Sequence, residues 1–349
     1  MHRTKKKVTM QDIADDLQVS KALVSLALSD KYGVSEDTRS KIVLRAIEMG
    51  YKFAAPKGKH NGVLFTIILR DMEMIKELFW SKIVKGIEKS MNVQHISINI
   101  LMWRGSIDES EVIHNILSAK PNGVIIMNEC DEAMLYVLSQ LNLPVVLIDI
   151  KHHINMIYDH VYANNYGGGY EAARYLVQHG HRRLAFIGSR SFSYSFQERY
   201  AGFKDYLERH APEGCLYEDV LGPSLPEDPI ETFDARAFKA LMTRENRPTA
   251  LFCANDPTAF KVYEILRTLK LKIPEDVSVI GFDNVETCSS MTPPLTSINI
   301  PKEEMGEEAV SLLLKRIENP ANVIKNLQLS TTIIPRDSVK PLTEIRKGM

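Results

Sequence analysis

Two serines and a lysine interrupt an aliphatic stretch near the start of the chain, "DLQVSKALVSLALSD" at residues 16–30. A helix buried in a core would not need Ser20, Lys21 or Ser25. Hydroxyl groups and the exposed amides at a helix start can bind phosphate oxygens, and a lysine can donate to the O6 and N7 atoms of guanine. The three side chains therefore indicate a helix whose outer face contacts nucleic acid.

The flanking residues predict the helices that would position this face. Thr9 and Asp12 form a capping-box-like start of a first helix, and Ser20 can cap a second helix after a short connection. Ser35 can cap a third helix, which Gly50 ends. The inward positions are Ile13, Ala14 and Leu17 in the first helix, Leu23, Val24, Ala27 and Leu28 in the second, and Ile42, Val43, Ala46 and Ile47 in the third. The pattern predicts an N-terminal all-α helix-turn-helix head, residues 1–51.

Charge is distributed unevenly along the chain, although the formal net charge of all 349 residues is only −1. Residues 1–60 hold 12 Lys and Arg against 7 Asp and Glu, whereas the remaining residues hold 31 against 37. A basic segment attached to an acidic body suits nucleic-acid binding by the first part alone.

Aliphatic strands alternate with amphipathic helices after residue 62, which predicts a parallel α/β architecture. One series of strands is "GVLFTIIL", "HISINILM", "NGVIIMN" and "PVVLID", and a second is "RLAFIG", "TALFCAND" and "VSVIGFDN". Two similar parallel-sheet subdomains imply a cleft, and ligands of such sheets bind beyond the carboxyl ends of the strands. The polar residues at those ends are Asp149, Asn255, Asp256 and Asp283.

The segments "TMQDIADDLQVSKALVSLAL", "VSEDTRSKI" and "MGY" resemble the DNA-binding head of the lactose-repressor family of bacterial transcription regulators. The family usually shows V-S-x-x-T-V-S at the second helix, and this chain has Leu23 in place of the threonine. The resemblance implies that Lys21, Ala22 and Leu26 read base edges; the position of Leu26 is often an arginine in the family. It implies further DNA contacts at Thr9, Ser20, Ser25 and Tyr51.

A linker, residues 52–61, follows the head in "KFAAPKGKHNG". Family members carry a short hinge helix here, whose leucine inserts into the minor groove and kinks the operator. This chain has no such leucine. Phe53 could insert instead, or it could dock on its own domain.

The segments "NNYGGGYEAARYLVQHGHRRLAFIG", "RPTALFCAND", "IPEDVSVIGFDN" and "TPPLTSINIPKEEMGEEAV" resemble the effector core of the same family, which is similar to periplasmic sugar-binding proteins. The resemblance implies that Arg199 binds the effector and that Asp283 accepts from ligand hydroxyls. It also implies polar contacts at Asn255 and Asp149 and an aromatic wall at Phe79 and Trp80, for which core packing is the alternative. Such a set suits a sugar or sugar derivative, or a nucleobase.

The resulting expectation is a transcription regulator, a repressor, whose affinity for DNA is controlled by a small molecule. The first core subdomain would span residues 62–162 and 291–325, and the second residues 163–290 and 326–341. We expect a homodimer, because a two-fold dimer matches a near-palindromic operator. Closure of the cleft around the effector would change the arrangement of the heads.

Motifs for other chemistries are missing. The pairs His152-His153 and His179-x-His181 lack a Cys or Glu at metal-ligand spacing, and "YGGGY" does not fit a dinucleotide fingerprint; its glycines would allow close helix-to-sheet approach. No G-x-S-x-G elbow or P-loop occurs. We therefore expect no catalytic residue, no metal and no cofactor. The four cysteines form no CxxC pair and indicate reduced thiols.

No apolar stretch approaches the ~20 residues that a membrane-spanning helix needs, which favours a cytoplasmic protein without membrane partners. Two alternatives belong to other classes. One is a cytoplasmic ligand-binding protein whose DNA-binding head is degenerate, suggested by Leu26 and the missing leucine. The other is a sugar- or nucleoside-processing enzyme on the same α/β core, which would need a base or nucleophile in the cleft.

Overall fold

The computed structural model describes residues 7–29, 32–53, 64–69, 78–94, 96–102, 115–116, 118–127, 132–150, 157–189, 193–220 and 234–342. Contacts divide the chain into two compact units, Met1–Tyr162 with Glu303–Leu327, and Ala163–Lys302 with Gln328–Met349. The greater part of the predicted linker, residues 54–61, lies outside the described residues.

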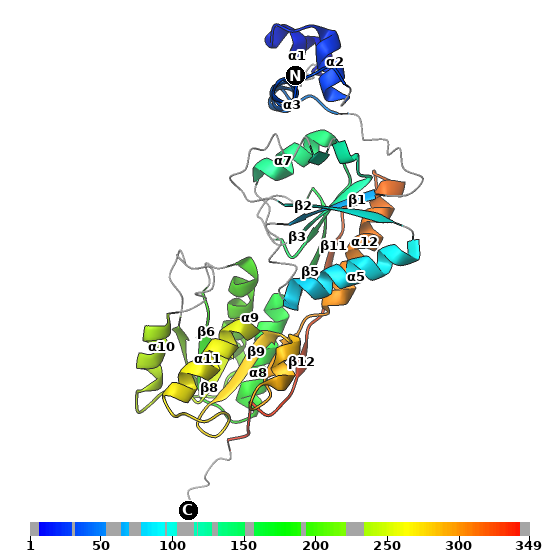
Figure 1. The fold of residues 1–349 in the computed structure, drawn as a ribbon. Helices are drawn as coiled ribbons and strands as arrows, with labels where there is room; N and C mark the ends of the chain where they lie inside the picture. Colours follow the sequence, from blue (N-terminus) through cyan, green and yellow to red (C-terminus); the bar gives the residue numbers. More distant parts are fainter. Residues whose placement is uncertain are drawn as a thin grey trace, which may run out of the picture. The chain divides into compact units, whose positions relative to one another are not determined.

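Three short helices form the head, α1 (Met10–Asp16), α2 (Lys21–Leu28) and α3 (Glu36–Glu48) (Figure 1). The predicted caps are present: Thr9, Ser20 and Ser35 each accept a hydrogen bond from a backbone N–H three residues ahead. Asp12 completes the capping box by accepting from the N–H of Thr9 at 2.7 Å. Gln18 turns the chain between α1 and α2 with a φ of 54°. The helix-turn-helix prediction is confirmed.

The first unit contains a six-stranded sheet with the strand order β11-β5-β4-β3-β1-β2. Its strands are β1 (Leu64–Leu69), β2 (Ser97–Met102), β3 (Gly123–Met127), β4 (Val145–Ile148), β5 (Asp159–Ala163) and β11 (Asn326–Leu329). The neighbours from β5 to β2 pair in parallel, as the sequence predicted.

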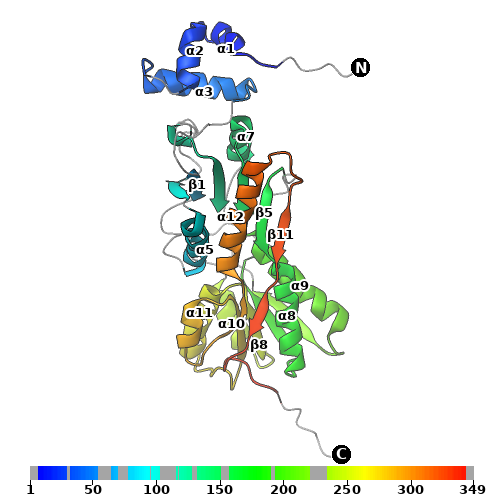
Figure 2. The same cartoon turned by 90° about the vertical axis from the view of Figure 1, so that its right-hand side faces the viewer.

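Helices cover both faces of this sheet. On one face, α7 (Glu132–Leu141) packs Met134 and Leu138 into the same buried cluster as Val124 of β3. Gly123 precedes Val124 in β3, so it lies on the other face of the sheet, where it meets α12 (Lys302–Glu318). Figure 2 shows α12 running alongside β5 and β11. The third helix, α5 (Leu78–Gln94), crosses α12 so closely that a Cβ at Gly86 would lie 1.9 Å from the carbonyl oxygen of Glu303.

The second unit contains a six-stranded sheet with the strand order β12-β10-β9-β8-β6-β7. Its strands are β6 (Arg183–Ile187), β7 (Leu216–Val220), β8 (Ala250–Cys253), β9 (Ser278–Asp283), β10 (Thr296–Asn299) and β12 (Thr332–Ile334). β12 pairs antiparallel with β10, and the other pairs are parallel. Its helices are α8 (Asn165–Gln178), α9 (Tyr194–His210), α10 (Ala235–Met242), α11 (Asp256–Thr268) and the 3-10 turn η1 (Glu286–Ser290).

Alternation along β6 assigns the helices of the second unit to two faces. Ala185 and Ile187 share a buried cluster with Phe238 of α10 and Val262 of α11. Phe186 points the other way and contacts Phe203 of α9 with a centroid separation of 6.1 Å. The sheet is therefore covered by α10 and α11 on one face and by α9 on the other.

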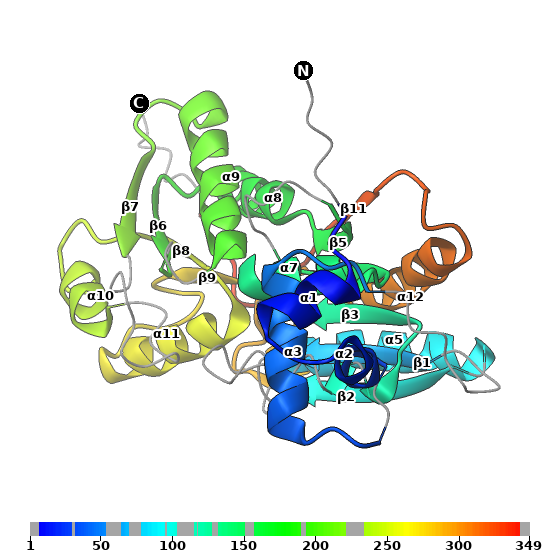
Figure 3. The same ribbon diagram turned by 90° about the horizontal axis from the view of Figure 1, so that it is seen from above.

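The glycines of "YGGGY" allow α8 to lie close to two neighbouring elements, β9 and α9. A Cβ at Gly168 would lie 2.6 Å from the ring of Phe282 in β9, which is the helix-to-sheet approach predicted. A Cβ at Gly169 would lie 1.9 Å from the carbonyl oxygen of Arg199, and one at Gly202 equally close to that of Tyr166. These two glycines allow α8 and α9 to pack backbone to backbone (Figure 3), an approach between helices that the sequence reading did not include.

Two boundaries differ from the prediction. Residues 326 and 327, which the sequence assigned to the second subdomain, belong to the first unit, since β11 lies in the first sheet. The sequence assigned residues 291–325 to the first subdomain, but β10 pairs with β9 in the second sheet, so the chain returns to the first unit only at Glu303. Seven of the described strands were predicted from the sequence, whereas β5, β7, β10, β11 and β12 were not. Among the described residues, none of the helices is both long and apolar enough to cross a membrane.

Candidate functional site

The outer face of α2 carries the residues that sequence analysis assigned to DNA. Lys21, Ala22 and Ser25 are exposed and Leu26 is half-buried. Leu23, by contrast, packs against the core of the head, which explains why an aliphatic residue is tolerated where the family usually has threonine. The helix thus separates an inner apolar face from an outer face that can donate to phosphates and offer apolar contact to bases.

Two of the hydroxyl groups predicted to contact DNA, those of Ser20 and Thr9, also cap helices. The Oγ of Ser20 accepts from the N–H of Leu23 at 3.1 Å, so this hydroxyl fixes the helix start and keeps its proton for donation to a phosphate. Thr9 plays the same capping role at α1, where its hydroxyl also donates to Asp12. Both residues are exposed, but only Ser20 can combine capping with donation to a phosphate, because the Thr9 hydroxyl donates its proton to Asp12.

Phe53 is docked in the first unit. Its side chain is 6% exposed, its ring meets that of Tyr51 edge-on at 5.4 Å, and its N–H donates to the carbonyl oxygen of Gln140 at 3.1 Å. Tyr136 on α7 donates to the carbonyl oxygen of Ile47 at 3.2 Å. Of the two roles left open for Phe53, the structure favours docking over insertion into DNA. Tyr51 is half-buried beside it.

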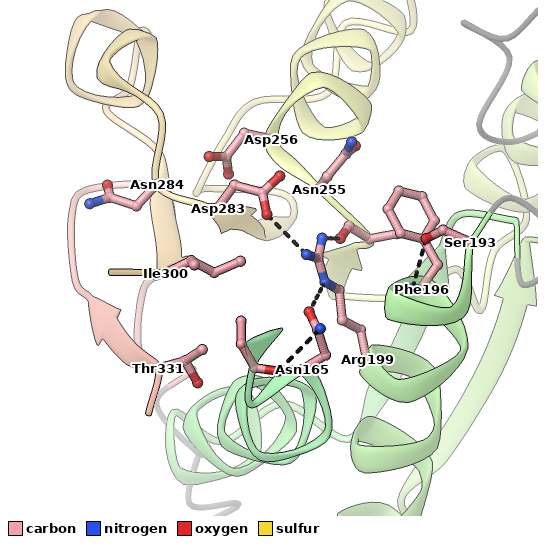
Figure 4. Close-up of polar contacts among 12 residues, drawn as sticks. Asn165, Ser193, Phe196, Arg199, Asn255, Asp256, Asp283, Asn284, Ile300 and Thr331 are labelled. Atoms are coloured by element: carbon pink, nitrogen blue, oxygen red, sulfur yellow. Dashed lines mark hydrogen bonds and ion pairs between the residues drawn. The ribbon is translucent and has the colours of Figure 1, made fainter. Parts of the chain in front are cut away.

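In the second unit, Arg199 on α9 lies at the carboxyl ends of the strands and is 3% exposed. Its Nε donates to Asn165 Oδ1 at 2.9 Å, its Nη1 donates to the carbonyl oxygen of Ala254 at 2.7 Å, and its Nη2 lies 3.1 Å from Asp283 Oδ1 (Figure 4). The guanidinium stacks on Phe282 at 3.8 Å from the ring centroid. Arg199 therefore joins α8, β8 and β9 at the carboxyl-terminal end of the sheet.

Asp283 ends β9 in a left-handed conformation, with a φ of 101°, and is 6% exposed. Its carbonyl oxygen accepts from the Nζ of Lys302, which is itself buried. Burial raises the pKa of the Asp283 carboxyl, while the charges of Arg199 and Lys302 act in the opposite direction. The strand end is thus held in a strained conformation by two cations, as is common at ligand-binding sites.

Asn255 caps α11. Its Oδ1 accepts from both the N–H and the hydroxyl of Thr258, at 3.0 and 2.6 Å. The cap leaves the side chain half-buried at the same strand edge as Arg199, whose Nη1 binds the preceding carbonyl. Of the predicted effector residues, Arg199, Asn255 and Asp283 are therefore brought together in the second unit.

The remaining predicted effector residues lie in the first unit. Trp80 is 7% exposed and meets Phe79 edge-on at a centroid separation of 4.9 Å, near the start of α5. Asp149 follows β4 with a φ of 52°, and its N–H donates to the carbonyl oxygen of Val161. The burial of Trp80 agrees with the core-packing alternative for that residue, whereas Phe79 and Asp149 are only half-buried.

Several residues of the edge around Arg199 were missed. Figure 4 shows Asn165, Phe196, Asn284, Ile300 and Thr331 around it, together with Asp256, which the sequence had already placed at a strand end. Asn165 opens α8 and carries no strand-end signal, and Phe196 lies one helical turn before Arg199 on α9, a spacing that could have identified it. Lys302 was missed because a lysine at a helix start is usually exposed.

The histidine pairs do not form a metal site within the part of the chain that is described. His179 Nδ1 pairs with the carbonyl oxygen of Tyr175 at 2.8 Å, and His181 Nδ1 with the hydroxyl of Thr249 at 3.0 Å. Groups of three or more potential metal ligands are not found among the described residues. His152 and His153 lie outside those residues.

Two family models match this chain, one over the head and one over part of the core. Residues 9–52 match the family described as bacterial regulatory proteins, lacI family, and residues 173–339 match the periplasmic binding protein-like domain. The chain therefore combines a lacI-family DNA-binding domain with a periplasmic binding protein-like domain. The predicted resemblance and the fold class, a helix-turn-helix head followed by two parallel-sheet subdomains, are therefore confirmed.

Two curated proteins similar to this chain are named as repressors. The chain is 29% identical over 338 residues to the HTH-type transcriptional repressor PurR of Vibrio vulnificus, covering 96% of this chain and 99% of the relative. It is 27% identical over 344 residues to the ribose operon repressor of Haemophilus influenzae, covering 96% and 99%. A lacI-family regulator from Enterococcus faecium with bound ribose superposes with a TM-score of 0.67 at 25% identity, covering 80% of this chain and 100% of that one.

Proposed function

We propose that this protein is a lacI-family repressor that reads a near-palindromic operator as a homodimer, through Lys21, Ala22 and Leu26 of each α2. A small sugar-like or nucleobase-like effector binds around Arg199, at the carboxyl ends of β8 and β9, and changes the affinity of the protein for its operator. The protein acts in the cytoplasm, where it meets DNA, without enzymatic turnover and without a metal or cofactor. The observation that carries the proposal is the exposed face of a capped α2 on an intact three-helix head.

The residues around Arg199, at the carboxyl ends of β8 and β9, support a sugar-like or nucleobase-like effector. Arg199, Asn165 and Asp283 supply donors and acceptors in fixed positions, and Phe196 adds a flat apolar face 5.4 Å from the guanidinium. Polyhydroxylated rings need such an arrangement of polar groups and a stacking surface. The ribose operon repressor and the ribose-bound regulator among the similar proteins favour a sugar. Phe79 and Asp149 of the first unit, both half-buried, remain in the proposed contact set, whereas the burial of Trp80 favours its core-packing alternative.

The effector proposal is tested by calorimetric titration of the full-length protein with ribose and with guanine, comparing wild type with Asn255→Ser. Serine keeps the cap of α11 but removes the amide. We expect at least one probe to bind wild type, and Asn255→Ser to weaken that binding about tenfold at an unchanged melting temperature, because a lost hydrogen bond to a ligand costs about 1–1.5 kcal/mol. Equal binding by both proteins would remove Asn255 from the site. Binding of neither probe would contradict the proposed ligand classes.

Lys21→Ala is expected to lower the affinity for a selected operator by about 1–3 kcal/mol and to relax the preference at one base pair. The reason is that Lys21 stands exposed in the first turn of α2, where it can reach guanine acceptors. Fluorescence anisotropy with the operator, its single-base variants and an unrelated duplex measures the effect. A uniform loss on all duplexes would show a phosphate contact instead.

The alternative, a ligand-binding protein with a degenerate head, makes a different prediction for DNA. A functional head loses operator affinity steeply as salt rises, because phosphate contacts release counterions. A degenerate head would show no preference for any sequence at any salt concentration.

A further inference from the structure

The recognition helix α2 is too short to be stable by itself. It has eight residues, and its last turn carries no basic side chain. Isolated helices of this length are not stable in water, and the last carbonyl groups of any helix lack partners within it. Its C-terminal end must therefore be fixed by other groups if the outer face is to keep a defined position.

Two groups fix that end. Ser29 donates its N–H and its hydroxyl to the carbonyl oxygen of Ser25, at 3.1 and 2.5 Å. Arg39, on the second turn of α3, donates from Nη1 to the carbonyl oxygens of Ala27, at 3.0 Å, and of Leu26, at 3.4 Å. A cation at this position also interacts favourably with the negative end of the helix dipole.

Arg39 differs from the other basic residues of α3. It is 6% exposed. The side chain of Lys41 is 69% exposed and pairs with Asp37 on its own helix, and that of Arg45 is 39% exposed and pairs with Asp16 of α1. A buried guanidinium that bonds to the backbone of another helix holds the two helices in one arrangement, because both its charge and its hydrogen bonds depend on that arrangement.

We infer that Arg39 is a positioning residue for sequence reading: it does not touch DNA, but it fixes the C-terminal half of α2 and so sets the base preference of Leu26. The inference rests on the proposed DNA-binding function. Leu26 is connected directly, because its own carbonyl oxygen accepts from Arg39. Side chains that read bases must be held within about 0.5 Å of the productive geometry, so a shift of this turn would blur the preference without removing the contacts to phosphates.

The test compares full-length wild type, Arg39→Met and Arg39→Lys, with Arg45→Met as the control from the same helix. Each protein selects DNA from a random-sequence pool, and its affinity is measured for the wild-type site and for an unrelated duplex at one salt concentration. Leu26→Ala identifies the base pairs whose preference depends on Leu26. Circular dichroism at the assay temperature shows whether each head is folded.

We expect Arg39→Met to bind the wild-type site about tenfold more weakly, to bind the unrelated duplex within about twofold of wild type, and to lose preference at the base pairs linked to Leu26. Arg39→Lys should recover part of the preference, and Arg45→Met should behave as wild type. If Arg39→Met does not fold, Arg39→Lys decides by the same comparison.

Two results would overturn the inference. One is a folded Arg39 variant with the wild-type preference and affinity, which would make the residue a contributor to stability alone. The other is an equal loss on both duplexes, which would make it a source of charge. If wild type itself enriched no sequence, the proposed function would fail and this inference with it.

Discussion

Replacing Arg199 by methionine is expected to lower the free energy of unfolding of the second unit by about 3–5 kcal/mol, because it leaves Asp283 as a buried carboxylate without its partner. The Arg199 and Asp283 side chains are only 4% and 9% exposed, so water cannot replace the lost ion pair. The substitution also removes the donors to Asn165 and to the carbonyl oxygen of Ala254. Denaturant unfolding followed by circular dichroism measures the loss.

A second substitution separates charge from packing. Arg199→Met combined with Asp283→Asn should regain a large part of the lost stability, because the buried charge is gone, but it should not regain effector binding. Arg209→Met is the control on the same helix, since Arg209 is 69% exposed and pairs with Asp205 at the surface. If the double variant were no more stable than Arg199→Met alone, the buried charge of Asp283 would not be the cause.

Asp256→Asn is expected to remove a pH dependence of the second unit's stability. Burial, and next the charge of Asp283, raise the pKa of Asp256 from 3.8 to about 7, against the hydrogen bonds from Ser297 and the N–H of Val285. The folded protein therefore holds a proton that the unfolded chain has lost above about pH 4. The stability that this proton contributes is complete at low pH and falls as pH rises towards 7, by on the order of 4 kcal/mol in total.

The measurement is the free energy of unfolding of wild type and Asp256→Asn between pH 4 and 8. Asparagine can keep both contacts, because its oxygen accepts from Val285 and its amide donates to the Ser297 hydroxyl. Wild type should lose stability relative to Asp256→Asn as pH rises, with no further relative change well above pH 7. The exposed Asp337→Asn serves as the control. Parallel pH profiles for wild type and Asp256→Asn would contradict the raised pKa.

The head could be predicted almost completely from the sequence, because its signals are local. Thr9, Ser20 and Ser35 are cap residues, and each lies three positions before the amide that it binds. Gly50 ends α3 with a φ of 79°, a conformation that glycine adopts without strain. The contact from Arg39 to α2 was not predictable in this way, since it depends on how two helices pack.

The buried aliphatic strands were predicted, as was β2, in which Ile98 and Ile100 alternate with Ser97 and Asn99; several strands rich in polar residues were missed. β5 contains Asp159 and His160, both buried; Asp159 is neutralised by Arg316 of α12 at 2.8 Å, a partner more than 150 positions away in sequence. β7 is an edge strand and mixes polar with apolar residues. Periodicity alone does not reveal such strands, because the compensating charge or the solvent-facing edge is a tertiary feature.

The candidate effector edge was predictable only in part. Asn255 and Asp283 follow buried strands, and strand ends are where ligands bind in parallel sheets. Nothing in the sequence itself showed that Arg199 pairs with Asp283, or that Asn165 and Lys302 join them. These contacts link α8, α9, β8 and β9 through packing.

The proposed function depends first on α2 reading DNA sequence in a two-fold dimer. The most direct measurement is selection of bound DNA from a random-sequence pool by the purified full-length protein, with sequencing of what is retained, without and with ribose or guanine. We expect enrichment of a near-palindrome whose half-sites lose their preference in Lys21→Ala. Enrichment of no sequence under any of these conditions would contradict the proposed function.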